Sequence, residues 1–288
     1  MGLMRARLER SEVDMKANHA SVWFWLAAPI AILLAVATGS ELFVGGVFRG
    51  DAPNLVAQAV GQDYVTLAVA LPVLVISAVL AGRGSRRARL VWLGVMAYVL
   101  YTYVIYAFHV RFNPLFLVYV ALLGLSLYAL IGGLATMDFG EIKARSTQRM
   151  PTRAASIFLG AMALLFYFVW LSEVVPALLA GHAPPSVTAA GTPTGSVHVL
   201  DMAWMLPAMG LTAIWLWQKR PIAYALAGSL LTFASLMTLA IGAMMVAMSF
   251  YDESVSLGMA AVFGGVSAAS VGMLVWYMKG LKSPNGDE

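Results

Sequence analysis

The chain has 288 residues, of which 61% are hydrophobic and only 11% are charged, so it is far more apolar than a soluble domain. Its net charge of +4 invites a nucleic-acid partner, but the basic residues lie between apolar stretches, which excludes nucleic acid. The lack of cysteine in the sequence excludes disulfides, thiolate nucleophiles and cysteine-ligated metal centres. We therefore expect an integral membrane protein whose main partner is the lipid bilayer.

Eight stretches are long and apolar enough to cross a bilayer, whose core of about 30 Å requires about 20 residues of helix. They cover residues 21–46, 63–81, 90–109, 114–137, 154–180, 198–217, 222–249 and 258–278. The predicted fold is thus an all-α integral membrane protein with eight transmembrane helices in one domain, 21–278. A segment over 1–20 precedes this domain and a tail over 279–288 follows it.

The basic residues occupy every second connection, which predicts the orientation through the positive-inside rule. Of the 18 lysines and arginines, only Arg49 and Arg111 fall in the other set of connections. We therefore expect both termini in the cytoplasm. The basic connections carry Arg5, Arg7, Arg10, Lys16, Arg83, Arg86, Arg87, Arg89, Lys143, Arg145, Arg149, Arg153, Lys219, Arg220, Lys279 and Lys282.

Two short motifs recur in the two halves of the chain. Ser40-Glu41 in the first span has a counterpart in Ser172-Glu173 of the fifth, and Leu71-Pro72 in the second span has one in Leu206-Pro207 of the sixth. The pattern is consistent with two parallel four-helix repeats, and chance recurrence is the alternative. The repeats would cover 21–137 and 154–278.

The ionisable residues at membrane depth gather on one side of the predicted bundle. A charge inside a membrane costs at least about 2.5 kcal/mol, so such residues usually face a bundle interior or a water-filled cavity. Here they all fall in the extracytoplasmic half or at its surface, which predicts an acidic and polar ligand pocket open to that side. The ionisable set is Glu41, Asp63, His109, Arg111, Glu173, His198 and Asp201, and the neutral Asn113 lies beside Arg111.

His198 and Asp201 lie three residues apart and share one helical face, a spacing that could chelate a metal ion with a third ligand from another span, either Glu173, Glu41 or His109. Histidine with carboxylates suits zinc, iron or manganese, so a divalent metal cofactor is one hypothesis. The alternative is that these two residues only begin a helix, where Asp201 interacts favourably with the helix dipole.

The third span carries a polar stripe of Tyr98, Thr102, Tyr106 and His109 at spacings of four, four and three. These side chains share one face of a helix, so we expect that face to point into the bundle. There the hydroxyl groups would either line a ligand cavity or bond to neighbouring helices.

The stretches "GQDYVTLAVALP" (61–72) and "YTYVIYAFHVRFNPLFLVYVALLGLSLYAL" (101–130) resemble segments of multi-pass bacterial membrane proteins that are themselves uncharacterised. The resemblance implies a bacterial inner-membrane location. It implies no activity and no site residue.

Three functions are compatible with these patterns. The first is binding of a cation or of a small polar or lipidic ligand in the extracytoplasmic pocket, either with or without transport. Its residues would be Glu41, Tyr98, Thr102, Tyr106, His109, Arg111, Glu173 and Asp201. The second is a metal-dependent enzyme of the outer leaflet acting on a lipid or a quinone-like substrate. The third is a non-catalytic membrane subunit or an assembly factor; the sequence does not indicate the oligomeric state.

Overall fold

The computed structural model describes residues 22–250 and 257–282. Within these residues, eight helices are long and apolar enough to cross a membrane, which confirms the predicted all-α multi-pass fold. The predictions for 1–20, with their four basic residues, and for 283–288 lie outside the described residues. The spans are Val22–Val44, Pro53–Gly82, Arg86–Phe108, Phe116–Ala135, Thr152–Ala180, Ser196–Trp217, Pro221–Ser249 and Leu257–Lys279.

Five of the spans are built mainly from a single helix each, namely α5 (Arg86–Phe108), α6 (Phe116–Ala135), α8 (Thr152–Ala180), α12 (Pro221–Ser249) and α13 (Leu257–Lys279). The other three contain a five-residue π-helical turn. The first span joins α2 (Ala27–Gly39) to η1 (Ser40–Val44). The second joins α3 (Pro53–Val65), η2 (Thr66–Ala70) and α4 (Leu71–Gly82), and the sixth joins α10 (Ser196–Leu200), η3 (Asp201–Met205) and α11 (Leu206–Trp217). Two short helices, α7 (Phe139–Ala144) and α9 (Pro185–Ala190), lie in connections.

The second span is longer than its sequence predicts. It begins at Pro53 rather than at 63, so Asp63 is the eleventh residue of α3 and is buried, not a residue at the mouth of the span. The prediction was wrong because Asn54, Gln58 and Gln62 lower the hydropathy of this stretch. In the structure Asn54 and Gln58 are partly buried and Gln62 is buried, so this polar stretch belongs to the span and not to a connection.

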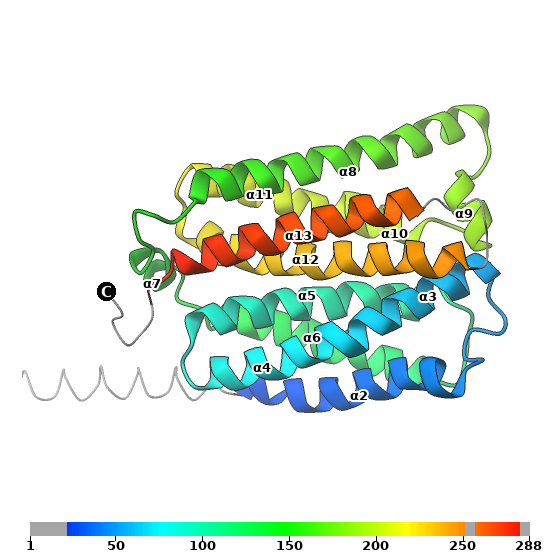
Figure 1. Cartoon of the computed structure of the whole chain (residues 1–288), viewed down its shortest axis with the longest axis horizontal. Helices are drawn as coiled ribbons and strands as arrows, with labels where there is room; N and C mark the ends of the chain where they lie inside the picture. The colour runs from blue at the N-terminus through cyan, green and yellow to red at the C-terminus, as the bar shows by residue number, and fades with distance from the viewer. Residues whose placement is uncertain (1–21, 251–256, 283–288) are drawn as a thin grey trace, which may run out of the picture.

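Helix α5 runs through the middle of the bundle and is the most enclosed of the eight spans (Figure 1). Its neighbours include α4, α6 and α12, and α12 also packs on α3 and α13. Gly94 makes the close crossing with α12 possible, because a Cβ atom there would lie 2.4 Å from the Ser229 carbonyl oxygen. The predicted polar stripe of α5 therefore points inward, with Tyr98, Thr102 and Tyr106 buried.

The π-helical turns η2 and η3 occupy equivalent places. Each ends at a Leu-Pro pair, and the Leu71 and Leu206 amides donate to the carbonyls of Thr66 and Asp201, five residues back. Proline lacks an N–H group and its ring collides with the carbonyl four residues earlier, so a wider turn before it relieves the clash. This local likeness agrees with the four-helix repeat, which itself remains a prediction.

The two ends of the bundle differ in charge and in how they are closed. At the basic end, Glu141 of α7 bonds to Arg86 and Arg145, and the Lys282 amide donates to the Arg145 carbonyl at 3.0 Å. Leu281 is buried there. The end that carries α9 and the connections 45–52, 109–115 and 181–195 is called the opposite end below (Figure 1).

Candidate functional site

A cavity of about 300 Å³ lies within the bundle, toward the opposite end, and it is partly open where the exposed Val169 and Met259 line it. Helices α3 and α5 form one wall, and α8, α10, α11, α12 and α13 form the rest. The cavity therefore lies between the two predicted halves of the chain. Its polar lining residues are Gln58, Gln62, Tyr101, Thr102, Tyr106, His109, Trp170, Asp201 and Thr238.

Most of the wall is apolar, and much of it is methionine. The methionines are Met162, Met205, Met209, Met237, Met244, Met245 and Met259, and Phe166, Phe233 and Phe263 add aromatic surface. Methionine side chains are unbranched and polarizable, so they adapt to irregular apolar shapes. A wall of this kind suits an apolar molecule better than a hydrated ion.

Two polar stripes meet at the α3–α5 side of this wall. The side-chain amide nitrogen of Gln62 donates to the Tyr98 hydroxyl at 2.8 Å and to the Thr102 hydroxyl at 2.9 Å. Behind them, the Thr66 hydroxyl lies 2.9 Å from that of Tyr98. Gln62 and Thr102 line the cavity. The other two members of this hydrogen-bonded network, Thr66 and Tyr98, are buried in the bundle and do not line it.

Asp63 lies next to this network but does not line the cavity. Its Oδ1 atom accepts a hydrogen bond from the Tyr106 hydroxyl at 3.0 Å, and Tyr106 does line the cavity. The ring of Tyr106 packs against Phe48, Tyr103 and Tyr119, with centroid distances of 5.4 to 5.7 Å. The carboxyl group is thus buried, and the Tyr106 hydroxyl connects it to the cavity wall.

Asp201 is the one carboxylate among the residues that line the cavity in the described part of the chain. Both of its oxygens have partners, since Oδ1 accepts from the Tyr101 hydroxyl at 2.8 Å and Oδ2 from the Trp170 ring nitrogen at 2.7 Å. These two hydrogen-bond donors stabilise the carboxylate charge, so Asp201 is satisfied by protein groups alone.

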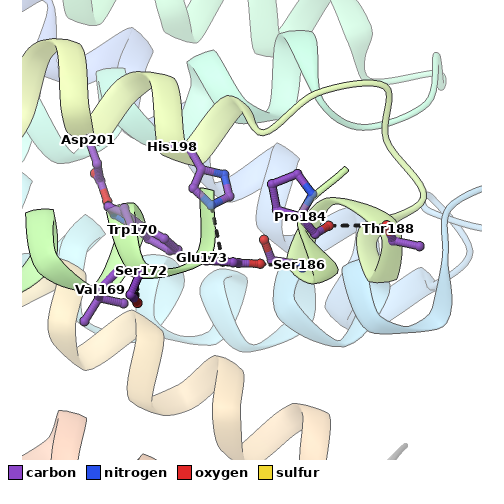
Figure 2. Close-up of polar contacts among 9 residues, drawn as sticks. All are labelled: Val169, Trp170, Ser172, Glu173, Pro184, Ser186, Thr188, His198 and Asp201. Carbon is purple, nitrogen blue, oxygen red and sulfur yellow. Dashed lines mark hydrogen bonds and ion pairs between the residues drawn. The ribbon is translucent and has the colours of Figure 1, made fainter. Parts of the chain in front are cut away.

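Glu173 of α8 accepts a hydrogen bond from the connection that follows its helix (Figure 2). Its Oε1 atom accepts from the Ser186 amide at 2.7 Å, and its Oε2 atom lies 3.4 Å from the Nε2 atom of His198. The His198 ring in turn meets the Trp170 ring edge-on at 4.6 Å. Glu173 therefore ties the connection between α8 and α10 to both helices, and it does not line the cavity.

Glu41 has the same role in the first half of the chain. Its Oε2 atom accepts from the Val47 amide at 2.7 Å, so it holds the connection that follows η1. Each Ser-Glu pair thus places a carboxylate at the end of its span, where it binds one backbone N–H of the next connection. Neither glutamate lies in the wall of the cavity.

A second hollow, of about 460 Å³, opens at the opposite end between the connections 50–52, 108–111 and 190–193. Arg111 lines this hollow, and its backbone amide donates to Asp51 at 2.9 Å. His109 and Val110 line both the hollow and the inner cavity. These two residues therefore form a wall shared by the inner cavity and the hollow.

His109 follows α5 directly and is half-buried. Its Nδ1 atom lies 3.0 Å from the Ser196 hydroxyl. Burial lowers the pKa of the imidazole, and the nearby Asp51 carboxylate opposes that shift only in part. The ring between the two spaces is thus held in its neutral form at neutral pH.

The residues predicted to bind a metal do not converge. His198 and Glu173 touch, but Asp201 is directed to Tyr101 and Trp170. Within 22–250 and 257–282, no group of three or more histidine, aspartate or glutamate side chains could hold a metal ion. The described side chains therefore do not fit the predicted divalent metal.

The predicted site residues thus lie in four places. Tyr98, Thr102 and Tyr106 belong to the network at the cavity wall, Asp201 lies across the cavity, and Glu41 and Glu173 hold connections. His109 and Arg111 line the hollow above.

Sequence reasoning missed Gln58 and Gln62, although a signal was present. The residues Asn54, Gln58, Gln62 and Thr66 follow one another at spacings of four, the same kind of stripe that predicted the inward face of α5.

No protein-family model, no curated protein and no solved structure matches this chain.

Proposed function

We propose that this protein binds a small lipid-soluble molecule with one polar end in the cavity between its two halves. The observation that carries the proposal is the cavity itself, which has a methionine-rich apolar wall and a polar edge formed by Gln62, Thr102 and Tyr106. Ligand sites for such molecules are typically apolar cavities in which a few polar groups fix the orientation. The ligand's polar end would lie against α3 and α5 and its apolar body against α12 and α13.

A cation is a weaker candidate for this cavity. The lining carboxylate, Asp201, already accepts two hydrogen bonds, and the wall around it is mostly apolar. A bound cation would lose its hydration shell without gaining the several oxygen ligands that compensate for this loss.

The proposal takes the protein to lie in a bacterial inner membrane, with both termini in the cytoplasm as the basic connections predict. The cavity would then lie in the extracytoplasmic half of the membrane. A ligand would enter either from the bilayer or through the hollow that His109 lines at the opposite end.

Binding can be measured with 1-aminoanthracene, whose fluorescence rises in apolar surroundings, on protein reconstituted in lipid nanodiscs. We expect a saturable signal over that of empty nanodiscs. The double variant Met237→Trp with Met245→Trp, which fills the cavity from α12, should abolish it. The control Val246→Trp, on the exposed face of the same helix, should keep it. A signal that is the same in all three proteins would refute the proposed site.

A further inference from the structure

The hydrogen-bond network at the cavity wall has a fixed direction. The Thr66 hydroxyl has one hydrogen and donates it to the Gln62 backbone carbonyl at 2.8 Å, because that carbonyl can only accept. Thr66 must therefore accept from the Tyr98 hydroxyl, 2.9 Å away. Tyr98 has then used its only hydrogen, so its oxygen must accept the bond from Gln62.

The order of donors and acceptors in this network sets the orientation of the Gln62 side-chain amide. Its nitrogen must face Tyr98, and the two N–H groups go to Tyr98 and Thr102. A flipped amide would place its carbonyl oxygen against a hydroxyl with no hydrogen left to give. Both amide donors are thus used, and the amide oxygen points away from the network.

The Gln62 Oε1 atom is buried and makes no hydrogen bond to any residue that the structure describes, and the Gln62 side chain is only 3% exposed. A buried carbonyl without a donor is unfavourable, because it has lost its hydrogen bonds to water and gained none within the protein. Gln62 lines the cavity, so a small rotation of its side chain toward the cavity would let a bound molecule supply the missing donor. The Thr66 and Tyr98 hydroxyl groups cannot supply it, since each has already given its one hydrogen to another acceptor.

We infer that the cavity selects ligands whose polar end is a hydrogen-bond donor, such as an alcohol, a phenol or a quinol, and that Gln62 Oε1 accepts this bond. The inference rests on the proposed function, because it assigns the polar end of the same ligand. It disfavours molecules whose polar end can only accept, such as ethers, esters and quinones. For these, the Gln62 oxygen would remain unpaired and would face a second acceptor.

Two competitors that differ by one methyl group test this inference, with 1-aminoanthracene as the reporter in nanodiscs. The phenol 2-naphthol carries a donor, and 2-methoxynaphthalene carries only an acceptor. We expect 2-naphthol to displace the reporter at a concentration about tenfold lower, after correction for partition into empty nanodiscs. Equal displacement by both compounds would overturn the inference while leaving the proposed function intact. A reporter that does not bind at all would instead overturn the proposed function.

Two matched variants assign the preference to one residue. Gln62→Met keeps the length of the side chain but removes the acceptor, so the two competitors should become equivalent. Gln58→Met alters the other glutamine that lines the cavity, one turn away on α3, and should keep the preference. Loss of the preference in Gln58→Met together with its survival in Gln62→Met would contradict the assignment. The comparison in the natural protein needs no variant, so it decides the matter even if Gln62→Met does not fold.

Discussion

Single carboxylates at membrane depth have structural roles here that their isolation in the sequence does not reveal. Glu41 and Glu173 each accept the backbone N–H of a connection, at 2.7 Å in both cases. A charged acceptor makes a stronger hydrogen bond than a neutral one, and it replaces part of the hydration that the carboxylate loses at the membrane surface. Both glutamates therefore stabilise connections at the opposite end of the bundle, and neither lines the cavity.

We expect Glu173→Ala to lower the free energy of unfolding by about 1–2 kcal/mol, because the Ser186 amide loses its acceptor. Glu173→Gln should lower the free energy of unfolding by less, since its amide oxygen can still accept the hydrogen bond from the Ser186 amide. Thermal unfolding in detergent micelles, followed by tryptophan fluorescence, measures both. Ser172→Ala is the control, because Ser172 bonds only to the Val169 carbonyl of its own helix. A loss in Ser172→Ala as large as that in Glu173→Ala would contradict the assigned role.

The neutral state of His109 predicts a dependence of stability on pH. Its pKa is lower in the folded protein than in the unfolded chain, so the unfolded chain binds the proton more readily. The contribution of neutral His109 to the free energy of unfolding is therefore complete above the ordinary histidine pKa. It falls as the pH drops from about 7 to about 5. His109→Gln should flatten this part of the profile. The exposed His182→Gln should leave it unchanged, and a flattened profile in that control would show that His109 is not its source.

At the scale of helices, the close approach of α3 and α12 positions the cavity wall. Gly61 lies next to Gln62, and a Cβ atom at Gly61 would come within 2.6 Å of the Met244 backbone. Any larger residue at this position must push the two helices apart.

Gly61→Ala should therefore destabilise the protein by about 1–3 kcal/mol, the usual cost of overpacking. Gly124→Ala on α6 is the matched control, because a Cβ atom there would meet nothing within 4 Å. It should be neutral or slightly stabilising, since alanine favours helix more than glycine does. Unfolding by sodium dodecyl sulfate measures both, and similar losses in the two variants would argue against a tight α3–α12 crossing.

Hydropathy predicted the eight spans because length and apolar composition alone decide what crosses a bilayer. It failed over 53–62 because Asn54, Gln58 and Gln62 resemble a connection until their burial against other helices is known. Periodicity predicted the buried face of α5 through Tyr98, Thr102 and Tyr106. The partner of each polar residue could not be predicted. Tyr101 and Asp201, for example, are 100 positions apart, and only the packing of α5 beside η3 brings them to 2.8 Å.

At the scale of the whole molecule, the orientation of the bundle in the membrane decides which compartment could supply the proposed ligand. The cavity lies toward the opposite end, and the hollow bounded by His109 and Arg111 opens there. Apart from Arg49 and Arg111, the basic residues that the structure describes lie on the other side, with Lys219 and Arg220 between α11 and α12. By the positive-inside rule, the opposite end should face away from the cytoplasm.

Because the natural chain has no cysteine, single introduced cysteines can test this arrangement without background labelling. In spheroplasts, a membrane-impermeant maleimide should label Ala183→Cys, in the exposed connection before α9. It should label Gln218→Cys, at the exposed end of α11, only after the membrane is permeabilised. The reverse pattern would place the cavity in the cytoplasmic half. The hydrogen-bond network at Gln62 would be unchanged in that case, but its ligand would have to come from the cytoplasmic leaflet.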